Sequence, residues 1–175
     1  MPGFLARAAD LPHGLALRAV TDADQPFVAD VYASTREEEM KLATAWNETQ
    51  KREFLRGQFA LQDRHYRLHY PNAEHAVIEQ RGQAIGRLVV NVGGAEVRLM
   101  DVALLPASRA RGVGTVILER LIAFADELRL PVTLHVEPFN PARRMYARAG
   151  FAFVEMRGIY EFMRREVPGQ LNTAS

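Results

Sequence analysis

The pattern of apolar and polar positions divides the chain into alternating strands and helices. Leu15 to Ala19 is expected to form a first strand, followed by a helix of about three turns from Asp24 to Thr35. A second helix is expected to begin at a capping box made by Asn47 and Gln50 and to run to about His69. Its apolar residues recur at spacings of four and seven, which is the period of one helix face.

Further strands are expected in the middle of the chain, at residues 74–80, 84–91 and 96–104. Turns that contain glycine separate these runs. Short β-rich runs joined by such turns favour an antiparallel meander.

The C-terminal half alternates helices with strands. A helix is expected from Thr115 to Leu128 and a strand from Val132 to Val136. Because a helical crossover joins this strand to the one before it, the two strands should lie parallel. A short helix from Asn140 to Ala149 and a terminal hairpin around Gly158 complete the pattern. An apolar stripe expected in the core consists of Val113, Ile117, Leu121, Phe124 and Leu128.

Composition favours a single domain. The 175 residues are 48% hydrophobic and 25% charged, as in an ordinary soluble globular protein. Proline and glycine punctuate residues 1–14, which are expected to form a loose arm. Residues 15–166 are expected to form one domain, and residues 167–175 a polar tail.

Charge and cysteine content exclude several classes of function. The net charge is +1, from 22 basic and 21 acidic residues, so no global field attracts nucleic acid or an anionic membrane. The absence of cysteine excludes disulfides, thiolate metal ligands and a cysteine nucleophile, and it agrees with a cytoplasmic location. The five histidines lack zinc-helix spacing, so no metal is expected. The first residues carry no long apolar stretch, so no signal peptide is expected, and the longest apolar runs are too short to cross a bilayer.

The stretch from Arg109 to Gly114 carries the first chemical signal. It has the form Arg-x-x-Gly-x-Gly and lies between an apolar strand and the start of a helix. Glycines let the backbone approach a ligand closely, and the first N–H groups of a helix have no partner within it. These donors and the helix dipole favour phosphate, and the two arginines add positive charge. The stretch therefore predicts a ligand with a pyrophosphate.

The spacing excludes two common phosphate loops. A nucleoside-triphosphate loop ends in Gly-Lys-Ser/Thr, whereas Thr115 follows Gly114 directly. A dinucleotide fingerprint needs a third glycine where this chain has Ile117. The remaining pattern resembles the acetyl-CoA loop of the GCN5-related N-acetyltransferase (GNAT) superfamily.

A second segment, from Leu134 to Phe151, extends this resemblance. Asn140 suits a helix N-cap, Pro141 the first helical turn and Gly150 a left-handed helix end. The segment resembles the family's strand, Asn, Ala, Tyr and Gly-Phe signature, and the resemblance covers roughly Leu17 to Arg164. It implies the acyl-CoA N-acyltransferase fold, in the α/β (α+β) class. That fold has a mixed, mostly antiparallel sheet of six to seven strands, with helices on both faces and with strands 4 and 5 parallel and splayed.

The resemblance also implies which residues hold acetyl-CoA as the co-substrate. The N–H groups of Val102 and Leu104 are expected to bind the acetyl carbonyl and the pantetheine arm, because the cofactor pairs like an extra strand between splayed strands. The amides from Arg111 to Thr115 are expected to hold the pyrophosphate. The complete set of expected cofactor-binding residues is Val102, Leu104, Arg109, Arg111, Gly112, Val113, Gly114, Thr115, Asn140 and Arg143.

A small group of side chains is expected to carry out the chemistry. Acetyl transfer from a thioester to an amine needs a neutral amine, a donor for the oxyanion and a proton for the leaving thiolate. Tyr146 stands at the family's helix tyrosine and is expected to protonate the thiolate; the alternative is a core aromatic. His135 and Asp101 are candidates for the general base, with Glu137 acting through water as a third. A histidine satisfied at a strand edge is the other interpretation of His135. Ser108 has no evident base partner, and the resemblance implies direct attack by the amine.

The expected function is therefore acetyl-CoA-dependent transfer of an acetyl group to a primary amine of a small molecule, peptide or protein. The alternatives are a non-catalytic acyl-CoA-binding regulatory domain and a protein-interaction module that has lost the cofactor. The partners expected are acetyl-CoA, an amine and a second copy of the chain in a possible homodimer, with neither nucleic acid nor a membrane. The sequence does not select the acceptor. Candidates to contact it are Glu37, Glu38, Glu39, Trp46, Tyr66, Tyr70 and Tyr160.

Overall fold

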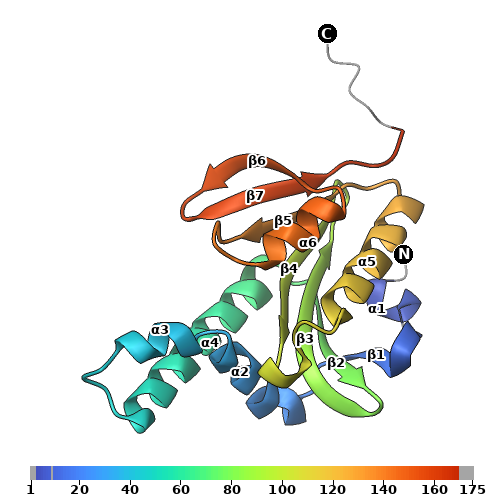
Figure 1. The fold of residues 1–175 in the computed structure, drawn as a ribbon. Helices are drawn as coiled ribbons and strands as arrows, with labels where there is room; N and C mark the ends of the chain where they lie inside the picture. Colours follow the sequence, from blue (N-terminus) through green and yellow to red (C-terminus); the bar gives the residue numbers. More distant parts are fainter. Residues whose placement is uncertain (1–2, 9, 170–175) are drawn as a thin grey trace.

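The computed structural model describes residues 3–8 and 10–169, which build a seven-stranded sheet with helices on both faces (Figure 1). The strand order is β1-β2-β3-β4-β5-β7-β6. The strands are β1 (Leu15–Ala19), β2 (Glu74–Gln80), β3 (Gln83–Val92), β4 (Val97–Leu104), β5 (Val132–Val136), β6 (Ala152–Arg157) and β7 (Tyr160–Arg165).

The helices form two groups, one on each face of the sheet (Figure 1). Their bounds are α1 (Phe4–Arg7), α2 (Gln25–Ser34), α3 (Glu37–Leu42), α4 (Glu48–His69), α5 (Val113–Glu127) and α6 (Ala142–Arg148). In residues 3–8 and 10–169, no helix combines the length and the apolar character that crossing a bilayer requires.

The sheet changes direction at β4 and β5, which run parallel as predicted from the helical crossover between them. Their ladder ends at the pair Leu99 and Leu134, although β4 continues to Leu104. Pairing of β4 with β3 is irregular at the same place, because Val89 lies opposite Asp101 and the next residue of β3 lies opposite Leu99. An extra residue on one strand bends it. The bend carries β4 away from β5, which confirms the expected splay.

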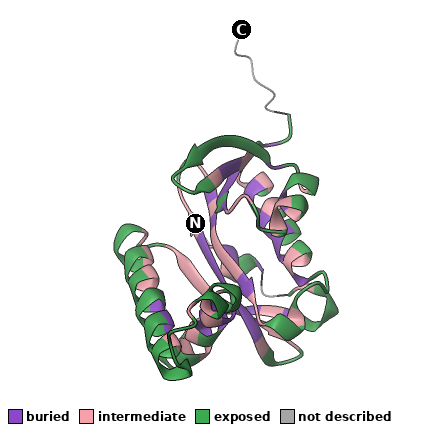
Figure 2. Ribbon diagram, turned by 60° about the vertical axis from the view of Figure 1, so that its left-hand side comes forward, coloured by how far each residue is buried: buried purple, intermediate pink, exposed green. Residues whose placement is uncertain are grey.

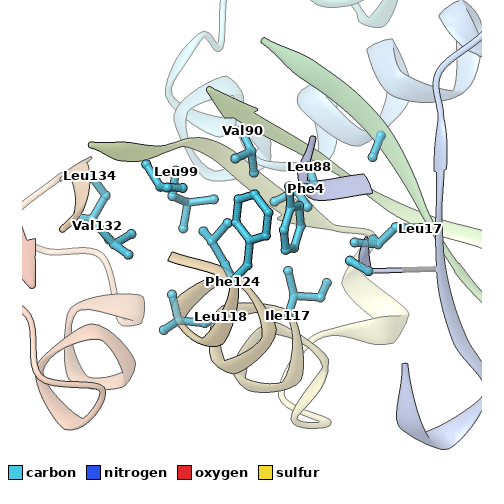
Figure 3. Packing of buried hydrophobic residues seen from close by; sticks show 14 of the residues in the cluster. Phe4, Leu17, Leu88, Val90, Leu99, Ile117, Leu118, Phe124, Val132 and Leu134 are labelled. Carbon is cyan, nitrogen blue, oxygen red and sulfur yellow. The ribbon is translucent and has the colours of Figure 1, made fainter. Parts of the chain in front are cut away.

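The main core lies between the sheet and α1, α5 and α6. The predicted stripe on α5 is buried at Val113, Ile117, Leu121 and Phe124, and Leu128 packs at its edge. Figure 3 shows Phe124 against Phe4, with the leucines and valines of the sheet around both rings. A helix with one such apolar stripe gains stability chiefly by covering a sheet face.

A smaller core lies on the opposite face, under α2 and α4. It contains Val28, Tyr32, Leu55 and Phe59. The capping box predicted at the start of α4 is present, with both of its hydrogen bonds at 2.9 Å. Most of α4 is nevertheless exposed (Figure 2). The large apolar residues of α4 that remain exposed are Phe54, Leu61 and Leu68.

The described part of residues 1–14 differs from the expected loose arm. Phe4 starts a short helix, is fully buried and meets Phe124 edge-on at 5.4 Å between ring centroids. The carboxylate of Glu74 accepts from the N–H of Phe4 at 2.7 Å and from that of Leu5 at 3.1 Å, so it caps this helix. Burial of one aromatic ring outweighs the local effect of glycine and proline.

The remaining expectations for the ends of the elements agree with the structure, apart from one connection. Gly150 and Gly158 have φ of +94° and +63°, as expected at a helix end and a hairpin turn. The residues after α2, which the sequence pattern did not assign to a helix or strand, form α3, with Arg36 at its N-cap. Of the expected tail, Val167 is buried, and residues 170–175 lie outside the described residues. One domain over residues 15–166 stays a prediction.

Candidate functional site

A cavity of about 580 Å³ lies where β4 and β5 part. Tyr146, His135 and Asp101, the side chains expected to carry out the chemistry, all line it. Val102 and Asn140 of the expected cofactor set line it as well. The fold thus brings together residues from β4, β5 and α6 at the point where the sheet opens.

Tyr146 lies on α6, at the wall of the cavity. The residue is 6% exposed, and its ring packs on Phe151 at 5.8 Å between centroids. Burial, and secondarily the charge of Asp101, raise the pKa of Tyr146 to about 12. The phenol therefore stays protonated near neutral pH and is available as a proton donor.

Asp101 has a partner that the sequence analysis missed. Its carboxylate forms an ion pair with Arg87 of β3, whose residue is only 6% exposed. Arg87 also donates from Nη2 to Oε1 of Gln62 at 2.5 Å, and its guanidinium lies over the rings of Tyr32 and Phe59. A lone cation within the apolar run of β3 was the available signal, since buried charges need partners. The ion pair holds the Asp101 carboxylate beside the cavity.

His135 lies on β5 with its ring near Phe162, 5.1 Å between centroids. Partial burial, followed by the charges of Arg98 and Arg157, lowers the pKa of His135 below its ordinary 6.5. The imidazole is therefore neutral near pH 7 and can accept a proton. Glu137, the third candidate base, also lines the cavity, 3.7 Å from Arg36.

The tyrosines named as candidates to contact the acceptor also meet at this cavity. Tyr66, Tyr70 and Tyr160 line it. Tyr66 donates to the carbonyl of Met100 at 3.4 Å, and burial raises the pKa of Tyr66 so that its phenol stays neutral. Trp46, by contrast, contacts Phe54 in a tilted arrangement, 5.1 Å between ring centroids, and lies outside the lining, as do Glu37, Glu38 and Glu39.

The glycine loop, which is the stretch from Arg109 to Gly114 before α5, lies outside the lining of the cavity. Its two glycines differ in their surroundings. Gly112 has φ of +81°, and a Cβ added there would meet nothing within 4 Å. A Cβ on Gly114 would lie 3.4 Å from Sδ of Met145, so this glycine lets α5 approach α6. No side chain caps α5, whose first N–H groups lack partners within the helix. Open space beside free amides is a cradle that fits a phosphate.

Several side chains expected to hold the cofactor bond to the protein itself. Arg109 bonds to Leu104 and Ser34, and Nε of Arg143 lies 2.5 Å from the carboxylate of Glu161. Oδ1 of Asn140 accepts from the N–H of Ala142 at 2.9 Å, a local bond that caps α6. Arg111 and Thr115 are exposed near the cradle. Within the described ranges, no group of histidine and acidic side chains is placed to hold a metal ion.

Comparison with solved structures shows a shared fold at low sequence identity. PaiA N-acetyltransferase from Thermoplasma acidophilum, solved with coenzyme A, is 16% identical with a TM-score of 0.63, over 87% of this chain and 98% of that one. An acetyltransferase from Thermus thermophilus is 21% identical with a TM-score of 0.63, over 89% and 99%. A GNAT family acetyltransferase from Elizabethkingia anophelis, solved with acetyl-CoA bound, is 14% identical with a TM-score of 0.58, over 88% and 99%.

Sequence comparison gives the family directly. A search of curated proteins finds no match. The model of the acetyltransferase (GNAT) family matches residues 33–151, which is more than half of the chain. This range contains the glycine loop, α5, β5 and Tyr146. The chain belongs to the acetyltransferase (GNAT) family.

Proposed function

We propose that this protein is an acetyl-CoA-dependent N-acetyltransferase that transfers the acetyl group directly to a primary amine of a small molecule, peptide or protein. The observation that carries the proposal is the buried, protonated phenol of Tyr146 beside Asp101 and His135, in the cavity between the diverging strands. The coenzyme A and acetyl-CoA in two similar structures support the choice of co-substrate. Assembly as a homodimer and a cytoplasmic location stay predictions.

The proposed cofactor site runs from the cavity to the glycine loop. Beyond Leu99, β4 has no ladder partner on the β5 side, so the N–H groups of Val102 and Leu104 are proposed to bind the acetyl carbonyl and the pantetheine arm. The amides from Arg111 to Thr115 are proposed to hold the diphosphate, with the Arg111 guanidinium adding charge. Asn140 and Arg143 complete the set at the start of α6.

The proposed chemistry uses one acid and one base. The amine nitrogen attacks the thioester carbonyl, so that a C–N bond forms while the C–S bond breaks. Tyr146 gives its phenolic proton to the leaving thiolate, and His135 takes a proton from the amine. Asp101 is the second candidate base. Its ion pair with Arg87 also suits a role in which its charge acts electrostatically and no proton is transferred. Glu137 remains a third, acting through water.

A thiol-release screen over classes of amine tests this function. An acetyltransferase releases free coenzyme A only when a suitable amine is present. The alternative, a non-catalytic acyl-CoA-binding regulatory domain, binds acetyl-CoA without release in any amine class. Binding by calorimetry together with turnover in the screen therefore separates the two functions.

Replacing Gly112 with valine is expected to weaken acetyl-CoA binding at least about tenfold, since about 1.4 kcal/mol of lost contact has that effect. The new side chain enters the open space where the diphosphate is proposed to lie. Gly82→Val is the matched control, because Gly82 also has a positive φ, +79°, with nothing within 4 Å of an added Cβ. Both variants carry similar backbone strain, about 1–2 kcal/mol. Equal affinities for acetyl-CoA in the two variants, by calorimetry, would contradict the proposed cradle.

The pH dependence of kcat/KM distinguishes the candidate bases. A base must be unprotonated to act, so activity falls as pH drops through its pKa. Because the pKa of His135 lies below 6.5, the acidic limb is expected below pH 6.5. His135→Ala should remove this limb, whereas Asp101→Asn should leave its position unchanged. If neither variant changes the limb, both assignments are wrong.

A further inference from the structure

The side chain of Arg109 extends from the glycine loop to the C-terminal end of α2. Its Nε donates to the carbonyl of Leu104 at 2.9 Å. Its Nη2 donates to the carbonyl of Ser34 at 3.2 Å and to Oγ of the same residue at 3.1 Å. The hydroxyl of Ser34 in turn donates to the carbonyl of Val31 at 2.7 Å. Arg109 thus joins the end of β4 to the last turn of α2, where Ser34 lies 75 residues before Arg109 in the chain.

These bonds complete a helix end that would otherwise lack a donor. Ser34 is the last residue of α2 and is 9% exposed. The last carbonyls of a helix have no partner within it, and a cation near a helix C-terminus is favourable. The fork of an arginine can serve several oxygens at once in fixed geometry, whereas a lysine cannot. Arg109 therefore matches the acceptors that it meets on α2 and β4.

The residues that follow Ser34 form part of the cavity wall. Thr35 and Arg36 both line the cavity. Arg36 lies 2.8 Å from the carboxylate of Glu39 and 3.7 Å from that of Glu137, at the end of β5. Contacts thus run from the end of β4, through Arg109 and α2, to the end of β5. They span the opening between the two strands on the side away from α5.

We propose that Arg109 is a positioning residue for the amine side of the cavity, meaning the wall with Thr35, Arg36 and the candidate acceptor contact Tyr66, rather than a ligand of the diphosphate. It holds the C-terminus of α2, and with it Thr35 and Arg36, against the end of β4. The inference rests on the proposed N-acetyltransferase function, and it revises the expectation from the sequence that Arg109 binds the cofactor. The two arginines of the Arg-x-x-Gly-x-Gly pattern then have different roles. Arg111 helps to bind the coenzyme, and Arg109 positions the wall that meets the acceptor.

The matched variants Arg109→Met and Arg111→Met test this division, because each removes one positive charge from the same loop. Arg109→Met is expected to raise the KM for an amine found in the screen about tenfold, the loss that about 1.4 kcal/mol of positioning energy produces. Its Kd for acetyl-CoA, by calorimetry, should stay within about twofold of the wild-type value. Arg111→Met should show the reverse: its Kd for acetyl-CoA should rise, and its KM for the amine should stay near the wild-type value.

Two further variants separate positioning from charge and from folding. Arg109→Lys keeps the charge but loses the fork, so it should not restore the amine KM. Ser34→Ala removes only the hydroxyl acceptor; it should raise the amine KM by a smaller factor and add little to Arg109→Met, because the two share one interaction. Ser34→Ala also carries the test if Arg109→Met folds poorly.

Two results would overturn the inference while the proposed function stands. One is a loss of acetyl-CoA affinity in Arg109→Met as large as in Arg111→Met. The other is an amine KM unchanged in both Arg109→Met and Ser34→Ala. A wild-type protein that binds no acetyl-CoA would instead overturn the proposed function itself, and this inference with it.

Discussion

Replacing Tyr146 with phenylalanine is expected to lower kcat by about 10²- to 10⁴-fold, the range that removal of a general acid produces. The phenol is buried and protonated in the cavity and is the proposed proton donor, so without it the thiolate must leave unprotonated or take a proton from solvent. The ring itself is retained, so its packing against Phe151 should persist. Steady-state kinetics with the best amine from the screen measure the effect.

The matched control for Tyr146→Phe is Tyr66→Phe, which removes a hydroxyl from a partly buried tyrosine of the same cavity. The Tyr66 hydroxyl donates to the carbonyl of Met100, and its loss should act mainly on the amine KM. Calorimetry should find acetyl-CoA affinity in Tyr146→Phe close to that of the wild type. A fall in kcat of similar size in both variants would show that loss of any cavity hydroxyl suffices, and Tyr146 would lose its assignment as the acid.

Replacing Arg87 with methionine is expected to destabilise the protein by about 3 kcal/mol, the lower end of the cost of breaking a buried ion pair. The lower end applies because the side chain of Asp101 remains 22% exposed and keeps some contact with solvent. The substitution leaves the Asp101 carboxylate without its cation and removes the guanidinium from its place over the rings of Tyr32 and Phe59. Urea unfolding followed by circular dichroism measures the free energy of unfolding.

The double variant Arg87→Met/Asp101→Asn isolates the cause of that destabilisation. Removing the stranded charge should recover a large part of the lost free energy of unfolding, because the penalty comes from an unpaired carboxylate. A double variant no more stable than Arg87→Met would mean that lost packing, and not the charge, produced the effect. Activity of Arg87→Met, measured below its unfolding temperature, then reports how far Asp101 depends on this partner.

Much of the architecture followed from short stretches of sequence. The capping box of α4 depends on two residues three positions apart, and both of its bonds are present. Gly150 and Gly158 stand where a positive φ is needed, and each ends the element that the pattern assigned to it. The parallel arrangement of β4 and β5 followed from a helical crossover of suitable length. Local propensity, periodicity and connection rules act over a few residues, so they can be read without knowledge of distant contacts.

Candidate chemistry was also accessible from short motifs, although partners were not. The sequence nominated Tyr146, His135 and Asp101 separately, and the structure places all of them on one cavity. It gave no means to pair Asp101 with Arg87, because the match depends on the register of β3 against β4. The bend of β4 that opens the cavity likewise depends on an irregular pairing between strands.

The sequence by itself determined the order of the strands and of α2, α4, α5 and α6, the glycine loop and the candidates for the reactive side chains, because each is encoded within a few neighbouring residues. Only the tertiary structure decided that Phe4 belongs to the core and that Leu55 and Phe59, rather than Leu61 and Leu68, face inward. It also directed Arg109 toward α2. Each of these outcomes depends on which surfaces meet after the chain folds. Burial and ion pairing between distant segments then outweigh the local preferences that a sequence displays.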